Sequence, residues 1–235
     1  MKVGIVIITY NISAEVFLLQ IAAIKKFCKD DFVIHVIDNS DDKEIAEHIR
    51  YHSSVHGIDY TKTFSGSKGS SDSHAFAANF AYQKFKDSYP YFIFLDHDCI
   101  PVKEFSVVEA LDGGHVAGGI GQNKSKKYPW VGCLYINNAA IDNDLVDFSP
   151  NAEHGLDTGG NLYKILEKYG AETFLDFNEA YHENPYFKDK NYGFYSMIKE
   201  DTFIHFVNGS GWNPISNNKE RLSSLVNIVK EKTGL

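Results

Sequence analysis

Short apolar runs alternate with amphipathic segments along the first 100 residues of the chain. The apolar runs predict buried strands at 3–9, 32–37, 58–61 and 91–95. Helix-compatible positions lie between them: Phe17, Ile21, Ile24 and Cys28, residues 41–50, and Ala77, Phe80, Ala81 and Phe85. Strands that alternate with helices form a mostly parallel sheet covered on both faces. We therefore predict an α/β fold with a doubly wound sheet flanked by helices.

The second half of the chain is less regular. Its apolar runs predict strands at 131–136 and 203–207. Its helical positions are Leu162, Ile165, Leu166 and Tyr169, then Leu222, Leu225, Val226 and Val229. Segments 137–155 and 180–192 mix aromatic with polar residues, so we interpret them as functional loops. We expect a single domain over 1–235, with halves at 1–100 and 101–235.

Composition narrows the class of protein. Hydrophobic residues make up 43% of the chain, which is enough for a core, so neither a disulfide scaffold nor a disordered chain is indicated. The formal net charge of -8 disfavours a nucleic-acid partner. Three widely spaced cysteines favour reduced thiols, and the apolar run at 3–8 is too short for a signal peptide or a membrane span. We therefore expect a cytoplasmic protein without a transmembrane segment.

Three polar clusters stand where predicted strands end: Thr9-Tyr10-Asn11, Asp38-Asn39-Ser40 and Asp96-His97-Asp98. Ligands of open α/β sheets bind beyond the carboxyl ends of the strands, so we expect the clusters to meet in one site. Asp96 and Asp98 stand two residues apart on an extended chain and so project to the same side. Their hard oxygen atoms suit Mg²⁺ or Mn²⁺ bound to phosphates. The alternative is a strand-end Asp that only caps the following turn.

The motifs GIVIITYN, HVIDNS, AAN and FIFLDHD, in this order, resemble the nucleotide-binding half of GT-A glycosyltransferases, close to glycosyltransferase family 2. The resemblance implies a GT-A fold in which 1–100 binds the nucleotide and 101–235 faces the acceptor. It implies that Thr9 and Tyr10 line the base and that Asp38 contacts it. It also implies that Asp96 faces the ribose, with a direct or water-mediated contact to the metal, and that Asp98 ligates the metal.

His205 is the candidate for a third metal ligand. It lies far downstream of the Asp-His-Asp motif, where the resemblance implies a further ligand that is frequently histidine; the alternative is a core histidine. The Gly-rich segment 208–212 follows it and can approach a phosphate closely. This segment ends in Trp212, whose indole can stack on a sugar, as can that of Trp130. Either tryptophan can equally serve in packing.

A Gly- and Ser-rich segment at 64–73 is expected to be a loop. The resemblance places this loop near the diphosphate or the ribose of the donor. Asp72 and Ser73 are therefore candidate donor contacts. Lys68 is a candidate phosphate contact, although a lysine in such a loop ordinarily faces solvent.

Asp157 is the candidate general base. The resemblance implies a base carboxylate at a loop-to-helix junction in this region, and a base must take the proton of the acceptor hydroxyl. Asp is also a favoured N-cap, so the capping alternative stays open. Glu153 is the reserve candidate. A base opposite the leaving group implies inversion at the anomeric carbon, whereas a carboxylate that only binds sugar hydroxyls allows retention.

The resemblance thus implies a hexosyltransferase-type, inverting enzyme that uses a nucleotide-diphosphate sugar, with a UDP-sugar favoured, and Mn²⁺ or Mg²⁺. Its acceptor would be a glycan, a lipid-linked glycan or another hydroxyl compound in surface glycan or polysaccharide assembly, and peripheral membrane association through a partner stays open. Two alternatives remain. A sugar-1-phosphate nucleotidyltransferase would need a Gly-rich, basic segment after the first strand, which residues 9–13 lack. A non-catalytic nucleotide- or glycan-binding protein would keep the fold without turnover.

Overall fold

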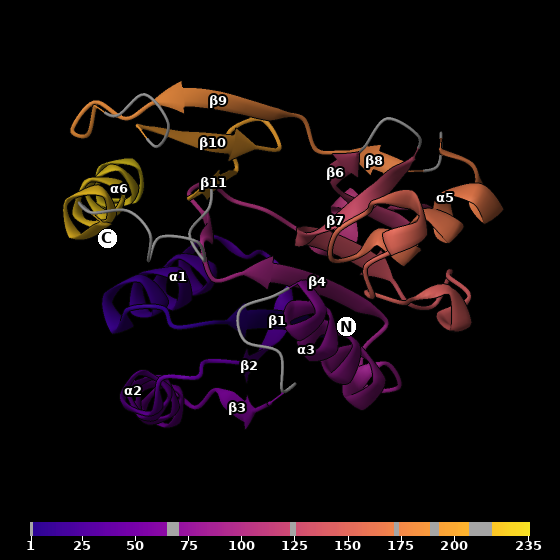
Figure 1. Cartoon of the computed structure of the whole chain (residues 1–235), viewed down its shortest axis with the longest axis horizontal. Helices are drawn as coiled ribbons and strands as arrows, with labels where there is room; N and C mark the ends of the chain where they lie inside the picture. Colours follow the sequence, from indigo (N-terminus) through magenta and orange to yellow (C-terminus); the bar gives the residue numbers. More distant parts are fainter. Residues whose placement is uncertain (1, 65–70, 123–125, 172–173, 189–192, 207–217) are drawn as a thin grey trace.

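A seven-stranded sheet forms the middle of the molecule (Figure 1). The computed structural model describes residues 2–64, 71–122, 126–171, 174–188, 193–206 and 218–235. The strands of this sheet are β1 (Lys2–Thr9), β2 (Asp31–Asp38), β3 (Asp59–Lys62), β4 (Tyr91–Asp96), β6 (Val116–Gln122), β7 (Lys127–Asn137) and β8 (Phe174–Asp176). Their order is β3-β2-β1-β4-β7-β6-β8. The first four run parallel, β7 is antiparallel to both neighbours, and β8 is parallel to β6.

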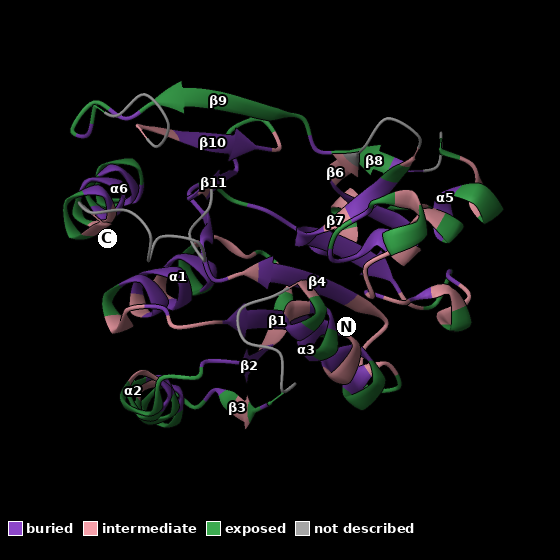
Figure 2. Cartoon of the chain, viewed as in Figure 1, coloured by how far each residue is buried: buried purple, intermediate pink, exposed green. Residues whose placement is uncertain are grey.

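Helices cover both faces of this sheet. They are α1 (Ala14–Phe27), α2 (Lys43–Val55), α3 (Ser71–Phe85), α4 (Val107–Ala110), α5 (Tyr163–Tyr169) and α6 (Asn218–Thr233). Side chains of β1 alternate between two cores: Val3 and Ile5 pack with residues of α1 and α6, whereas Val6 and Ile8 pack with residues of α3. Because both faces are covered, the central strands are buried along their length (Figure 2). This double burial explains the continuous apolar runs of the sequence.

A second, smaller sheet adjoins the first. Its strands are β5 (Cys99–Pro101), β9 (Glu179–Glu183), β10 (Phe194–Ile198) and β11 (Phe203–His205), in the antiparallel order β5-β11-β10-β9. Strand β5 follows β4 after a turn of two residues, so this sheet begins beside the carboxyl end of β4. Figure 1 shows it next to α6 and on the side of the main sheet that α1 covers.

The predicted fold class is confirmed, with local corrections. The segment at 64–73, expected to be a loop, contains the start of α3 at Ser71, while residues 65–70 lie outside the described part of the chain. The segment at 180–192, also expected to be a loop, begins within strand β9. All residues of β9 are exposed, so no buried face imposes an alternating apolar pattern on it. The five strands β5, β6, β8, β9 and β10 escaped the prediction.

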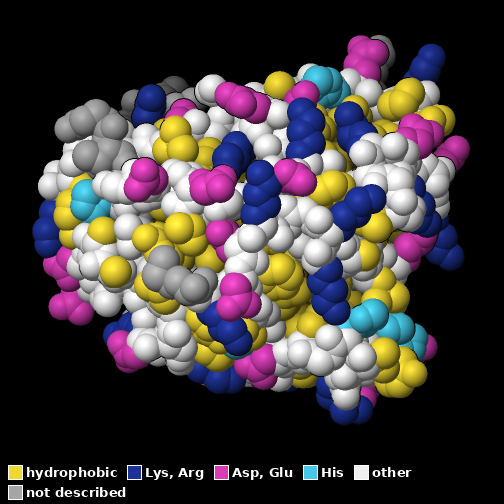
Figure 3. All heavy atoms as spheres, turned by 180° about the vertical axis from the view of Figure 1, so that it is seen from behind, with side chains coloured by type: hydrophobic (Ala, Val, Ile, Leu, Met, Phe, Trp, Pro, Cys, Tyr) yellow, Lys and Arg dark blue, Asp and Glu magenta, His cyan; other side chains and the backbone are white. Residues whose placement is uncertain are grey.

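The surface carries both signs of charge. Figure 3 shows the face behind the view of Figure 1, where Lys and Arg side chains are interspersed with Asp and Glu. Among the described residues, no helix is long and apolar enough to cross a bilayer.

The glycine at position 118 is required by the close approach of β6 and β7. A Cβ atom at Gly118 would lie 2.5 Å from the carbonyl oxygen of Cys133, which is backbone and cannot swing away. We expect Gly118→Ala to lower the free energy of unfolding by about 1–3 kcal/mol, as overpacking typically does. Urea denaturation followed by circular dichroism measures this, and an unchanged midpoint would contradict the described packing.

Candidate active site

Three strand ends meet at one edge of the main sheet. Thr9 at the end of β1 pairs with Asp38 of β2, and Ile8 pairs with Asp96 of β4. The backbone amide of Asn39 donates to the carbonyl oxygen of Thr9 over 2.9 Å. The polar clusters that follow these strands therefore converge, as the sequence predicts.

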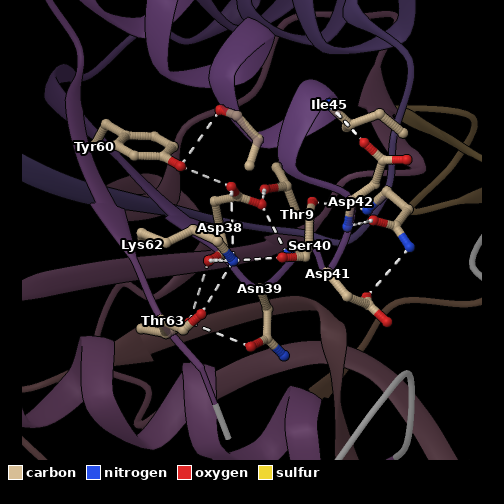
Figure 4. A network of polar contacts seen from close by, with 12 residues as sticks. Thr9, Asp38, Asn39, Ser40, Asp41, Asp42, Ile45, Tyr60, Lys62 and Thr63 are labelled. Atoms are coloured by element: carbon tan, nitrogen blue, oxygen red, sulfur yellow. Dashed lines mark hydrogen bonds and ion pairs between the residues drawn. The ribbon is translucent and has the colours of Figure 1, made fainter.

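Asp38 is the centre of a closed hydrogen-bond network (Figure 4). Its Oδ1 accepts from the hydroxyl of Thr9 at 3.1 Å and from the backbone amide of Ser40 at 3.0 Å. Its Oδ2 accepts from the hydroxyl of Tyr60 at 2.7 Å, and the ammonium of Lys62 lies 4.0 Å away. Asp38 has no exposed surface. The Asp38 carboxylate therefore links the ends of β1, β2 and β3 through hydrogen bonds.

The residues expected to line the base differ in what they can offer. Thr9 is fully buried, and its hydroxyl donates a hydrogen bond to Asp38. Tyr10 is half-buried, and burial, followed by its hydrogen bond to Asp41, raises the pKa of its hydroxyl. Tyr10 thus keeps a partly open ring at the edge of the site. The base contacts of Thr9, Tyr10 and Asp38 stay predictions.

Asp96 forms an ion pair with His74, a residue that the sequence reasoning missed. His74 lies in the first turn of α3, and its Nε2 is 2.8 Å from Oδ1 of Asp96. Burial has the largest single effect and raises the pKa of Asp96, but the charge and hydrogen bond of His74, with the charges of His97 and His205, together lower it by more. Burial has the largest single effect and lowers the pKa of His74, but the charge and hydrogen bond of Asp96, with the charges of Asp98 and Asp157, together raise it. Both shifts favour the ionised pair.

The two candidate donor contacts beside His74 are placed differently. Asp72 is exposed in the first turn of α3, whereas Ser73 is buried. The side-chain amide of Asn39 donates to the carbonyl oxygen of Ser73 over 3.0 Å and also contacts its hydroxyl. Ser73 therefore ties α3 to the end of β2. Lys68 and Trp212 lie outside the described residues.

Asp98 and His205 face each other. His205 Nε2 lies 4.0 Å from Oδ1 of Asp98, and both side chains are largely buried. Nδ1 of His205 lies 3.2 Å from the Ser196 hydroxyl and 3.5 Å from Oε1 of Glu179. Burial lowers the pKa of His205, but the hydrogen bond to Glu179 and the charge of Asp98 raise it on balance. A proton on Nδ1 shared with Glu179 leaves Nε2 directed at Asp98, the arrangement that carboxylate–histidine pairs give to metal ligands.

The turn that carries Asp98 is fixed from two sides. The buried Gln20 of α1 donates its side-chain amide to the carbonyl oxygens of Asp96 and Cys99, each over 2.8 Å. The backbone amide of Phe206 donates to the carbonyl oxygen of Asp98 over 2.8 Å. This turn and the end of β11 therefore hold Asp98 and His205 in one place.

Asp98 and His205 can bind a divalent ion as two protein ligands. Among the described residues, no group of three or more His, Cys, Asp or Glu side chains is arranged to hold a metal. Asp98 and His205 are opposed across 4.0 Å, whereas the near oxygen of Asp96 is occupied by His74. Ions that bind substrate phosphates often take only one or two protein ligands, with water and phosphate oxygens completing the shell. The expected set of three protein ligands is thus not assembled in the described part of the chain.

Asp157 lies on the exposed loop before α5 and does not cap a helix. Its Oδ1 accepts from the backbone amide of Thr158 over 2.7 Å, while the next helical turn begins at Gly160 with Gly159 as its N-cap. The capping alternative is therefore wrong. The hydroxyl of Thr158 donates to the carbonyl oxygen of Ser71 over 3.1 Å, which holds this loop against the start of α3.

Asp157 also belongs electrostatically to the site. Burial lowers the pKa of His74. The charge of Asp96 raises it, and the charges of Asp98 and Asp157 raise it to a smaller extent. The exposed carboxylate of Asp157 therefore acts electrostatically on the Asp96–His74 pair. Glu153, the reserve candidate, is exposed in the 3-10 helical turn Ala152–His154 that precedes this loop.

The fold is similar to those of solved glycosyltransferases. No family model matches this chain, and no curated protein matches it in sequence. The mannosyltransferase PcManGT from Pyrobaculum calidifontis, solved in complex with GDP-Man and Mn²⁺, superposes with a TM-score of 0.53 at 13% identity, covering 74% of this chain and 54% of that one. The galactosyltransferase LgtC, solved with donor and acceptor sugar analogs, gives 0.44 at 12% identity, covering 74% and 73%.

The similarity to the mannosyltransferase shows a GT-A-like fold. The chain spans about half the length of the mannosyltransferase. The narrower resemblance to glycosyltransferase family 2 stays a prediction.

Proposed function

We propose that this protein transfers a sugar from a nucleotide-diphosphate sugar to an acceptor hydroxyl, with Mn²⁺ or Mg²⁺ held by Asp98 and His205. The observation that carries the proposal is the Asp98–His205 pair at the carboxyl edge of a GT-A-like sheet. The similar mannosyltransferase binds GDP-Man and Mn²⁺, which supports a nucleotide-sugar donor. UDP-sugars and GDP-sugars are therefore the first donors to test.

Each polar side chain of the edge has a separate task in this proposal. An ion between Asp98 and His205 would neutralise the charge that grows on the departing diphosphate. Glu179 fixes the orientation of His205 through Nδ1. His74 keeps Asp96 ionised and holds its carboxylate in place, where the free oxygen can accept from a ribose hydroxyl. Tyr10 offers its ring to the base.

We propose that Asp157 is the general base. The Thr158 hydroxyl holds its loop to α3. The backbone amide of Gly159 also donates to the carbonyl oxygen of Phe148, whose own amide donates to Asn79 of α3 over 2.9 Å. Asp157 itself is exposed, so it can reach the hydroxyl of an acceptor and take its proton as the new bond forms. Attack from the side opposite the leaving group would invert the anomeric carbon. A hexose as the transferred sugar and a glycan as the acceptor complete the proposal.

A turnover assay tests this function directly. The chain is incubated with UDP- and GDP-hexoses, Mn²⁺ or Mg²⁺ and a panel of saccharide acceptors, and release of the nucleoside diphosphate is followed. We expect one donor to be turned over with a metal and not with EDTA. Release of pyrophosphate from a nucleoside triphosphate and a sugar 1-phosphate would instead identify a nucleotidyltransferase. Metal-dependent donor binding without any turnover would identify the non-catalytic alternative.

A further inference from the structure

A cavity of about 460 Å³ lies where the main sheet meets the small sheet. Gly119 and Gly121 of β6 line it together with Trp130 of β7. Residues 176–179, which connect β8 to β9, line it as well. His205 also belongs to the lining, so the cavity adjoins the candidate ion site.

The indole of Trp130 packs against Gly119 and Gly132. A Cβ atom at Gly119 would lie 3.0 Å from Cε3 of the indole, and one at Gly132 would overlap the same ring. Glycine at both positions therefore lets the indole lie against the backbone of β6 and β7. The indole is half-buried and its ring centre lies 4.8 Å from that of His205. The sequence thus provides a fixed aromatic surface in the wall of the cavity, beside the ion site.

The polar lining contains two carboxylates beside the donor groups of Lys127, Asn178 and His205. Asp176 and Glu179 are carboxylates, which are acceptors only when ionised, and Lys127 supplies one cation. The hydroxyl of Tyr181 donates to Oε2 of Glu179 over 3.1 Å. A phosphate group brings no donors and would meet two carboxylates. A sugar ring brings several hydroxyl donors together with an apolar C–H face for the indole.

We propose that this cavity binds the acceptor as a neutral pyranose, with its C–H face on Trp130 and its hydroxyls on Asp176 and Glu179. The inference rests on the proposed function, because it assigns the second substrate of that reaction. The acceptor oxygen forms the new bond to the anomeric carbon of the donor. The bond from that carbon to the diphosphate breaks, its electron pair leaves with the nucleoside diphosphate, and the hydroxyl proton passes to the base carboxylate.

Saturation-transfer NMR of the full chain, without donor, tests the cavity. The probes are methyl pyranosides of glucose, galactose, mannose and N-acetylglucosamine. We expect saturable binding of at least one, unimpaired by UDP or GDP with Mn²⁺. Trp130→Ala should weaken it by about tenfold. Tyr181→Ala, at a position that is 62% exposed and so carries little risk to the fold, should weaken it several-fold through Glu179.

Tyr51→Ala is the matched control, because Tyr51 is a similarly exposed tyrosine on α2 and outside the cavity. It should bind the pyranoside as the unaltered chain does. A protein that binds a nucleoside diphosphate with Mn²⁺ but none of the pyranosides overturns the inference and leaves the proposed function standing. Undiminished pyranoside binding by both Trp130→Ala and Tyr181→Ala overturns the inference as well. Pyranoside binding by a protein that binds no nucleotide supports the sugar site and overturns the proposed transfer.

Discussion

Replacing Asp98 with alanine is expected to lower metal-dependent sugar transfer by more than about 100-fold, with the fold retained. Loss of a residue that only supports a metal ligand typically costs 10–100-fold, and loss of one of two protein ligands should cost at least as much. Asp98 is 5% exposed and faces His205, and no group of three or more potential ligands forms among the described residues. Turnover of the donor found in the assay above, measured against Mn²⁺ concentration, gives the effect.

Asp96→Ala sharpens this prediction. The near oxygen of Asp96 is engaged by His74, so this variant should raise the Michaelis constant for the donor with a smaller change in the Mn²⁺ requirement. Glu104→Ala, at an exposed carboxylate that pairs with Lys29, should leave both parameters unchanged. An equal loss of the Mn²⁺ response in Asp96→Ala and Asp98→Ala would contradict the pairwise ion site and restore the set of three ligands.

Asp38→Ala is expected to lower the free energy of unfolding by about 3 kcal/mol. The substitution leaves the hydroxyls of Thr9 and Tyr60 and the amide of Ser40 without their charged acceptor in a buried place. Urea denaturation monitored by circular dichroism measures the loss.

Asp42→Ala supplies the scale for that measurement. Asp42 is the N-cap of α2, where it accepts from the amides of Glu44 and Ile45, and its removal should cost about 1 kcal/mol. A loss for Asp38→Ala no greater than that for Asp42→Ala would mean that the carboxylate of Asp38 is not enclosed. It would then be available to a nucleotide base, as the resemblance implies.

Sequence alone predicts the strands of the main sheet that are buried on both faces. Runs such as 3–9 and 91–95 are apolar at successive positions because both faces of β1 and β4 are covered. Parallel registry then brings Thr9, Asp38 and Asp96 to one edge, so the position of the site followed from strand order. In the small sheet, only the apolar run of β11 was predicted. Its strands have three to five residues, and β5 pairs with β11 about 100 positions away along the chain.

The sequence analysis did not identify His74 and Glu179 as site residues, and the physical reason differs between the two. His74 stands three residues before Ala77 and four before Ala78, on the buried face of α3, so extending the helical pattern by one turn would have found it. The Gly- and Ser-rich composition of 64–73 concealed that turn. Glu179 could not be found from sequence, because its contact with His205 depends on the pairing of β9, β10 and β11.

The measurement that tests the central claim most directly is calorimetric titration of the chain with UDP, GDP, CMP and dTDP, each in Mn²⁺ and in EDTA. The account predicts that one nucleoside diphosphate binds with Mn²⁺, that EDTA abolishes the binding, and that Asp98→Ala loses it while remaining folded. Absence of metal-dependent binding for every nucleotide would contradict the assignment of Asp98 and His205 as an ion site. It would leave a GT-A-like fold with another task.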